Sequence, residues 1–164
     1  MLLLLLATLT PCNLDAVTSF TQAQEQDLVT ITSFIARQAR RERGEEYEDA
    51  RKVVVGDLIG DKVPETVVLY TIESQGGSNN YIQYLAVFTR RNGHLVAVAH
   101  TSVGGKFRRS VELDAVVNQR VNLQTMSYAR TDPSCCPSIK AMTSYVLVGQ
   151  TLRERKVRTR AGDD

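Results

Sequence analysis

The sequence predicts an α+β fold in which an N-terminal amphipathic helix packs on an antiparallel meander sheet of about six to seven strands. Three observations predict it. Apolar residues recur at helical spacing from about residue 24 to residue 41. After residue 49 the pattern changes to short segments rich in Val, Ile, Tyr and Thr, which are typical of strands. The connections between these segments are too short for parallel crossovers, so neighbouring strands are expected to pair antiparallel.

The chain of 164 residues is long enough for one ordinary domain. We expect a signal peptide over residues 1–23, a single α+β domain over 24–152 and a basic, frayed tail over 153–164. Hydrophobic residues make up 43% and charged residues 23%, which is typical of a soluble globular protein. A net charge of +2 is too small to indicate a nucleic-acid partner.

The apolar run over residues 2–9 is too short to span a bilayer of about 30 Å, and we interpret it as the core of a secretory signal. No Lys or Arg precedes it, although signal peptides normally carry a positive start. Cleavage after Ala23 would use the small residues Thr21 and Ala23. Alternatively, Leu9 to Cys12 resembles a bacterial lipoprotein signal, with Pro11 departing from it, so that Cys12 would carry a lipid anchor. We favour a third interpretation, in which Cys12 lies in a discarded peptide.

The helix comes first in the predicted domain. Leu28, Ile31 and Ile35 are spaced to form one buried stripe. Arginines at its end suit the negative end of the helix dipole, and Gly44 is a typical helix stop.

The strands follow, over residues 52–57, 66–73, 81–89, 95–102, 109–117, 120–129 and 141–152. Asn92-Gly93 is typical of a tight hairpin turn and joins the third and fourth of them. The chain's two histidines, His94 and His100, fall in this turn and at a strand end, and we interpret both as ordinary surface residues.

The segment from Gly56 to Glu65 resembles the calcium-binding loops of FG-GAP-like repeats. Asp57, Asp61 and Glu65 match the spacing of the oxygen ligands in such loops. Ile59 and Lys62 depart from it, because they replace an oxygen ligand and a glycine. The resemblance implies a calcium site, whereas turn chemistry alone predicts a strand-to-strand turn with local hydrogen bonds, which is the interpretation that we favour.

The adjacent cysteines Cys135 and Cys136 form the most distinctive segment, Asp-Pro-Ser-Cys-Cys-Pro. If Cys12 is removed, they are the only cysteines left to pair in an oxidising compartment. A vicinal disulfide that stiffens the loop is our first interpretation, and free thiols, a soft-metal site and a redox switch remain open. Together with the Gly-Asp-x-x-Gly-Asp turn, this segment resembles a group of uncharacterised exported bacterial proteins. The resemblance implies a periplasmic or cell-surface location and no known activity.

Three functions are compatible with these features. The first is a non-enzymatic binding or interaction module of the bacterial cell envelope, with Tyr81, Tyr84, Arg90 and Arg91 on its surface; cross-strand packing is the alternative role for the tyrosines. The second is a thiol-dependent or redox-dependent envelope protein that uses the two cysteines. The third is a calcium-stabilised structural domain. The sequence contains no nucleophile elbow, zinc-binding helix, phosphate-binding glycine loop or dinucleotide fingerprint, so we assign no catalytic residue and expect no cofactor other than calcium.

Overall fold

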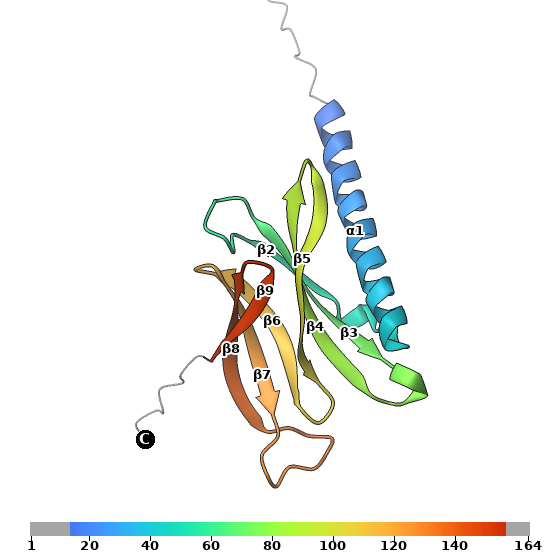
Figure 1. Ribbon diagram of the computed structural model, residues 1–164, viewed down its shortest axis with the longest axis vertical. Coiled ribbons are helices and arrows are strands. Elements are labelled where there is room, and N and C mark those ends of the chain that lie inside the picture. The colour runs from blue at the N-terminus through green and yellow to red at the C-terminus, as the bar shows by residue number, and fades with distance from the viewer. Residues whose placement is uncertain (1–13, 157–164) are drawn as a thin grey trace, which may run out of the picture.

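The computed structural model describes residues 14–156 and confirms the α+β class (Figure 1). One long helix lies beside an antiparallel sheet of nine strands. The elements are α1 (Leu14–Glu42), β1 (Glu45–Glu46), η1 (Glu48–Ala50), β2 (Lys52–Gly56), β3 (Glu65–Glu73), η2 (Gln75–Gly77), β4 (Tyr81–Arg91), β5 (His94–Gly105), β6 (Arg109–Val117), β7 (Arg120–Ser127), β8 (Ile139–Val148) and β9 (Thr151–Lys156).

The sheet has more strands than the six to seven that we predicted. The two-residue strand β1 falls in the acidic connector, which lacks the Val and Ile content of a strand. The predicted strand 141–152 is two strands, because Gly149 adopts a φ of 60° and turns the chain back on itself. Residues 153–156 therefore belong to β9 and not to a frayed tail, whose remaining residues 157–164 lie outside the described residues.

The helix α1 begins before the predicted residue 24, and no glycine or proline interrupts it between Leu14 and Glu42. It passes through the Ala23–Gln24 bond, and the apolar run and Cys12 lie outside the described residues. It ends at Glu42, and the next residue, Arg43, has a φ of 53° and takes the role that we predicted for Gly44. Within residues 14–156, no helix combines the length and apolar character needed to cross a membrane.

The helix packs on the sheet through Ile31, Ile35 and Ala39, which are all buried. Ile31 and Ile35 were predicted to be buried, but the prediction for Leu28 is wrong, since it is 55% exposed. Asp27, its neighbour, pairs with Arg90 at the tip of the β4–β5 hairpin, so Leu28 lies at the level where the sheet ends.

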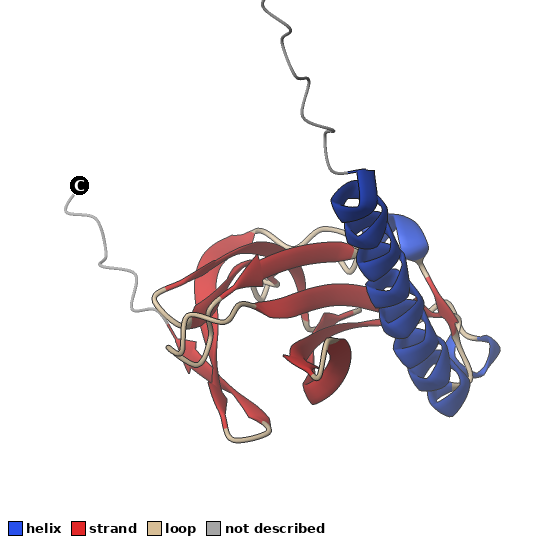
Figure 2. Cartoon of the chain, turned by 90° about the horizontal axis from the view of Figure 1, so that it is seen from above, coloured by secondary structure: helices blue, strands red, loops and turns tan. Residues whose placement is uncertain are grey.

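The strands follow one another in a meander, and each pairs antiparallel with the next from β3 onward. β1 and β2 pair with the same edge of β3. β1 pairs with the last residues of β3, and β2 pairs with its first residues. The pairing is interrupted at one place, since β5 and β6 share only the Gly105–Arg109 position. The sheet folds over there (Figure 2). As a result, β2 lies against β6 and β5 against β9.

The described residues form two apolar cores, and the fold-over creates the inner one. The inner core lies between the two halves of the sheet and includes Leu69, Leu85, Val103, Val121 and Leu123. The outer core lies between α1 and the outer face of β3, β4 and β5 (Figure 1). The residues of β3 alternate between the two, as a strand covered on both faces requires. The described helix covers only the N-terminal half of the sheet.

Gln83 and Gly104 allow the two halves to approach where the pairing stops. The Gln83 amide donates to the Val111 carbonyl at 3.0 Å, and the Val111 N–H donates to the Gln83 Oε1 at 2.8 Å. The side chain thus supplies the two hydrogen bonds that a neighbouring strand would supply. A Cβ at Gly104 would lie 2.4 Å from a Val111 methyl carbon and 2.8 Å from the Arg109 carbonyl oxygen, so only glycine fits.

Gly104→Ala is therefore expected to lower the free energy of unfolding by about 3 kcal/mol, because the Arg109 carbonyl is part of the backbone and must shift to admit a methyl group. Val96→Ala on the same strand removes an exposed side chain and should change it by less than about 0.5 kcal/mol. Urea unfolding monitored by circular dichroism measures both. Equal effects of the two substitutions would contradict the close approach at Gly104.

Candidate functional site

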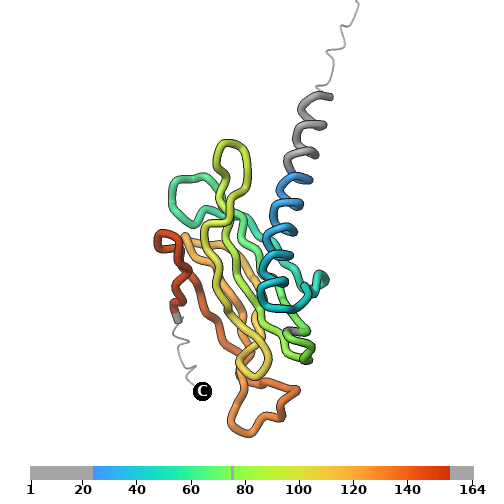
Figure 3. Tube along the Cα trace, turned by 45° about the vertical axis from the view of Figure 1, so that its right-hand side comes forward, coloured from blue at the N-terminus to red at the C-terminus, as the bar shows by residue number. Residues whose placement is uncertain are grey.

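The two adjacent cysteines lie in the cysteine loop, which we define as residues 128–138 between β7 and β8. Figure 3 shows this loop projecting beyond the end of the sheet. Both Cys135 and Cys136 are exposed, and their sulfur atoms lie 2.31 Å apart. The vicinal pair is thus presented on the surface and is not placed at the bottom of a cleft.

Asp132 organises the cysteine loop. Its carboxylate accepts hydrogen bonds from the Ala129 N–H at 2.7 Å and from the N–H and hydroxyl of Ser138, each at 2.9 Å. Both ends of the loop are therefore tied to one side chain. These donors, the Ala129 N–H first, hold the pKa of Asp132 below its ordinary value. The Tyr128 hydroxyl adds a bond to the Ser134 carbonyl at 2.9 Å, next to the cysteines.

A groove of about 640 Å³ lies on β6, β7 and β8, the half of the sheet that α1 does not cover. Met126 and Met142 line it, and Met142 is 44% exposed. Glu112 and Lys140 contribute a carboxylate and an ammonium group from β6 and β8. Lys140 is two residues beyond the cysteine loop, so the groove and the loop adjoin. We call this groove the methionine groove.

The structure places the three carboxylates whose spacing resembles a calcium loop in and beside the β2–β3 turn. Asp57 accepts hydrogen bonds from the N–H groups of Gly60, Ile59 and Lys62, of which the first does most to lower its pKa. Asp61 accepts from the Val63 N–H at 2.8 Å. Glu65, 1% exposed, accepts from the Leu58 N–H at 2.8 Å. At least one oxygen of each carboxylate thus accepts a backbone hydrogen bond of the turn, whereas the buried Glu65 Oε1 has no hydrogen-bond partner.

No cluster of three or more His, Cys, Asp or Glu residues within residues 14–156 is arranged to hold a metal ion.

The four residues predicted to form one interaction surface are not together. Tyr81 opens β4, and Arg90 and Arg91 close it, about 30 Å away at about 3.3 Å per residue. Tyr84 is 6% exposed and packs in the outer core, which corrects the prediction that it lies on the surface. Arg90 pairs with Asp27 of the helix. The cross-strand packing that was the alternative for the tyrosines applies to Tyr84, which stacks on Tyr70.

An aromatic cluster between α1 and the sheet was missed by the sequence analysis. His100 stacks on Tyr84 with ring centroids 5.0 Å apart, and its Nε2 lies 2.6 Å from the Tyr70 hydroxyl. Phe34 of the helix meets the edge of the His100 ring at 5.7 Å. Burial raises the pKa of Tyr70 and raises that of Tyr84 to about 12, so both keep their protons. The available signal was period-two alternation, which puts His100 on the same face as Ser102, the partner of Tyr84.

His100 shares a hydrogen bond with Tyr70 in this cluster. The tautomer of the imidazole decides whether the Tyr70 hydroxyl or the His100 Nε2 atom donates. Burial against the neighbouring rings lowers the pKa of His100, although part of the residue is exposed, and Arg41 opposes its charge while Glu42 favours it. Protonation of His100 would make both ring nitrogens donors, so Nε2 would then donate to the Tyr70 hydroxyl oxygen.

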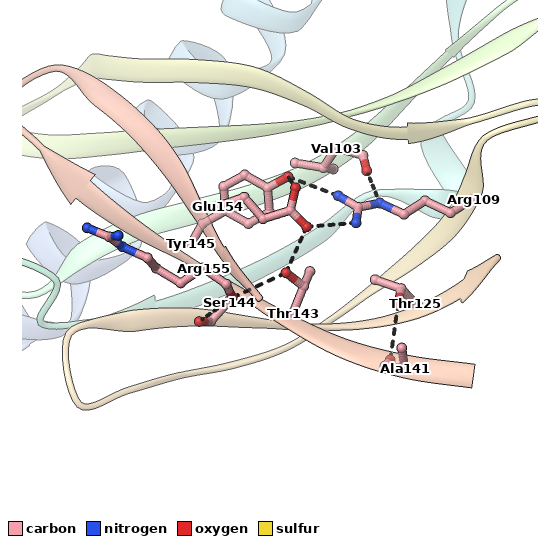
Figure 4. Close-up of polar contacts among 9 residues, drawn as sticks. All are labelled: Val103, Arg109, Thr125, Ala141, Thr143, Ser144, Tyr145, Glu154 and Arg155. Atoms are coloured by element: carbon pink, nitrogen blue, oxygen red, sulfur yellow. Dashed lines mark hydrogen bonds and ion pairs between the residues drawn. The ribbon is translucent and has the colours of Figure 1, made fainter. Parts of the chain in front are cut away.

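A second polar network joins the two halves of the sheet beside the β5–β6 junction (Figure 4). Arg109 of β6 donates to the Val103 carbonyl of β5 at 2.7 Å, to Glu154 of β9 at 2.7 Å and to the Tyr145 hydroxyl of β8 at 3.0 Å. Thr143 donates to the same Glu154 carboxylate at 2.8 Å. Arg109, ahead of the other partners, holds the pKa of Glu154 below its ordinary value. Four strands thus meet at one guanidinium group.

Comparison of the chain with protein-family models, with curated proteins and with solved structures gives no match.

His100 makes the stability of the protein pH-dependent. Its pKa is below 6.5 in the folded state, so the unfolded state binds more protons and the free energy of unfolding falls as the pH is lowered through about 6.5. His100→Gln is expected to remove this part of the pH dependence between about pH 7.5 and pH 5.5. His94→Gln, at the exposed start of β5, is the matched control and should retain it. Thermal unfolding across this range measures the difference, and parallel curves for wild type and His100→Gln would contradict the assignment.

Arg109→Met is expected to lower the free energy of unfolding by about 2 kcal/mol, because it leaves Glu154 and the Val103 carbonyl without their charged donor. Arg109 and Glu154 are 21% and 33% exposed, so water compensates part of the loss. Arg153→Met removes an exposed arginine from the same sheet edge and should cost less than about 0.5 kcal/mol. Denaturant unfolding compares the two variants. If Arg109→Met left the free energy of unfolding unchanged, the network would not hold the two halves of the sheet together.

Proposed function

We propose that this protein is a non-enzymatic binding module of the bacterial cell envelope, and that it recognises another protein through the cysteine loop and the methionine groove. The observation that carries the proposal is the position of the vicinal cysteine pair. It lies on an exposed, projecting loop that is closed by Asp132, next to a groove that the described helix leaves uncovered.

A loop that is already ordered suits recognition. Ordering a flexible loop on binding costs about 0.5–1.5 kcal/mol for each side chain that becomes immobilised. The hydrogen bonds of Asp132 and Tyr128 restrict the backbone of the cysteine loop before a partner arrives. The loop can therefore present Ser134, Cys135 and Cys136 at a low entropic cost.

The methionine groove suits a partner that offers apolar side chains. Methionine is flexible and polarizable, and it adapts to ligands of different shape. Glu112 and Lys140 at the groove can pair with opposite charges on the partner and so fix its orientation. The occupant that we propose is a surface segment of an envelope protein with apolar side chains between charged ones.

The envelope location is part of the proposal and rests on the sequence. The apolar run over residues 2–9 has the length of a secretory signal core. The Asp-Pro-Ser-Cys-Cys-Pro segment resembles exported bacterial proteins. Adjacent cysteines with bonded sulfur atoms would be maintained in an oxidising compartment such as the periplasm.

Site-specific photo-crosslinking in cells of the source bacterium tests the proposal. A photoreactive phenylalanine analogue at Ser134, on the tip of the loop, is expected to form a discrete adduct with one protein, which mass spectrometry identifies. The same analogue at Gln150, in the exposed β8–β9 turn, is the control and is expected to form none. Adding Asp132→Ala to the Ser134 variant should weaken the adduct several-fold, because the loop loses its closure.

An adduct of equal yield and composition at Gln150 would contradict a recognition role for the loop. So would the absence of any adduct at Ser134 while the protein is folded and present in the envelope.

A further inference from the structure

The cysteine loop is held in shape by groups other than the two sulfur atoms. Its ends are joined through the Asp132 carboxylate, and its middle is fixed by the Tyr128 hydroxyl and by the Cys136 N–H, which donates to the Pro133 carbonyl at 3.0 Å. None of these contacts involves a cysteine side chain. Breaking a bond between the sulfur atoms therefore leaves the closure of the loop in place.

The geometry of adjacent cysteines favours easy reduction. The Cα atoms of Cys135 and Cys136 are 3.8 Å apart, whereas ordinary disulfides have Cα separations of about 4.4–6.8 Å. A separation outside this range makes a disulfide more reducible. Both cysteines are exposed, so a reagent or a protein partner can reach them without unfolding the chain.

We infer that Cys135 and Cys136 form a reversible dithiol–disulfide site whose reduced form chelates a thiophilic metalloid, with trivalent arsenicals as the chemical class. The inference does not depend on the proposed recognition of a partner, since it concerns the chemistry of the sulfur atoms alone.

The redox step requires a dithiol donor, of either small-molecule or protein origin. A thiolate of the donor attacks one sulfur atom of the pair, the bond between Cys135 and Cys136 breaks, and a mixed disulfide forms. The second thiol of the donor then attacks the donor's sulfur in the mixed disulfide, which releases the cysteine as a thiol and forms the donor's own disulfide. Two electrons and two protons pass from the donor to the pair, so the donor is oxidised and the cysteines are reduced.

The binding step uses both thiols at once. A monosubstituted arsenic(III) oxide reacts with two thiols to form two arsenic–sulfur bonds, and its oxygen leaves as water with the two thiol protons. Thiolates are soft ligands, so they favour a soft centre such as arsenic(III) over calcium or magnesium. Because the loop is already closed, the two thiols stay on neighbouring residues of an ordered turn, and less freedom is lost on chelation than in an unstructured peptide.

The test uses the full chain with Cys12→Ser, so that only the pair contributes thiols. Alkylation and mass spectrometry count free thiols across a graded dithiothreitol series. The expected result is a change from none to two labels that reverses on reoxidation, with an unchanged circular dichroism spectrum. The reduced protein is then titrated with phenylarsine oxide, and one equivalent should bind.

Matched variants identify the site. Cys135→Ser and Cys136→Ser, each in the same background, should lose the arsenical by at least about tenfold in affinity, because one thiol cannot chelate. Asp132→Ala keeps both thiols and should bind on the order of tenfold more weakly than its parent, because the loop is no longer preorganised.

Three results would overturn the inference. The pair could remain unlabelled in excess dithiothreitol, be reduced only with loss of the circular dichroism spectrum, or be reduced without binding phenylarsine oxide. The photo-crosslink at Ser134 is read independently, so failure here leaves the proposed recognition function standing, and the converse also holds.

Discussion

The fold-over between β5 and β6 is the constraint on which the rest of the structure depends. A nine-stranded meander that stayed open would expose one apolar face, since α1 covers only the outer side of β3 to β5. Ending the β5–β6 pairing at Gly105 brings that face against itself and makes the inner core. The cost is an interrupted row of backbone hydrogen bonds, and the Gln83 amide and the Arg109 guanidinium replace part of it. Glycine at position 104 lets the backbones come close enough for both.

The same constraint explains how the two surfaces of the protein differ. The N-terminal half of the sheet is covered on its outer side, and Tyr70 and Tyr84 of the aromatic cluster are buried there, whereas His100 is exposed. On the C-terminal half, the methionine groove and the cysteine loop lie on strands that the described helix does not reach. A helix that packs on only one half of a folded sheet thus leaves the other half available for contacts with other molecules.

Sequence patterns predicted the helices and strands better than the tertiary contacts between them. Ile31 and Ile35 were correctly assigned to a buried stripe because helical periodicity decides which side of a helix is apolar. Leu28 has the same periodicity, but burial also needs a neighbour, and the sheet ends at its level. Tyr84 was placed on the surface for a similar reason, because only the path of α1 decides which sheet face is covered. The Arg109 network joins residues from four strands, and no local spacing indicates such a meeting. The cysteine loop was found from sequence because its two unusual residues are neighbours.

Closure of the cysteine loop by Asp132 has a consequence for how this surface can change over evolution or in the laboratory. The carboxylate bonds to Ala129 and Ser138 at the base of the loop, and the contacts at the tip are made by backbone atoms. The side chains at positions 134 to 136 can therefore be exchanged while the base that positions them stays the same. A library that randomises these three positions on the unchanged scaffold would vary the binding specificity while the fold stays the same.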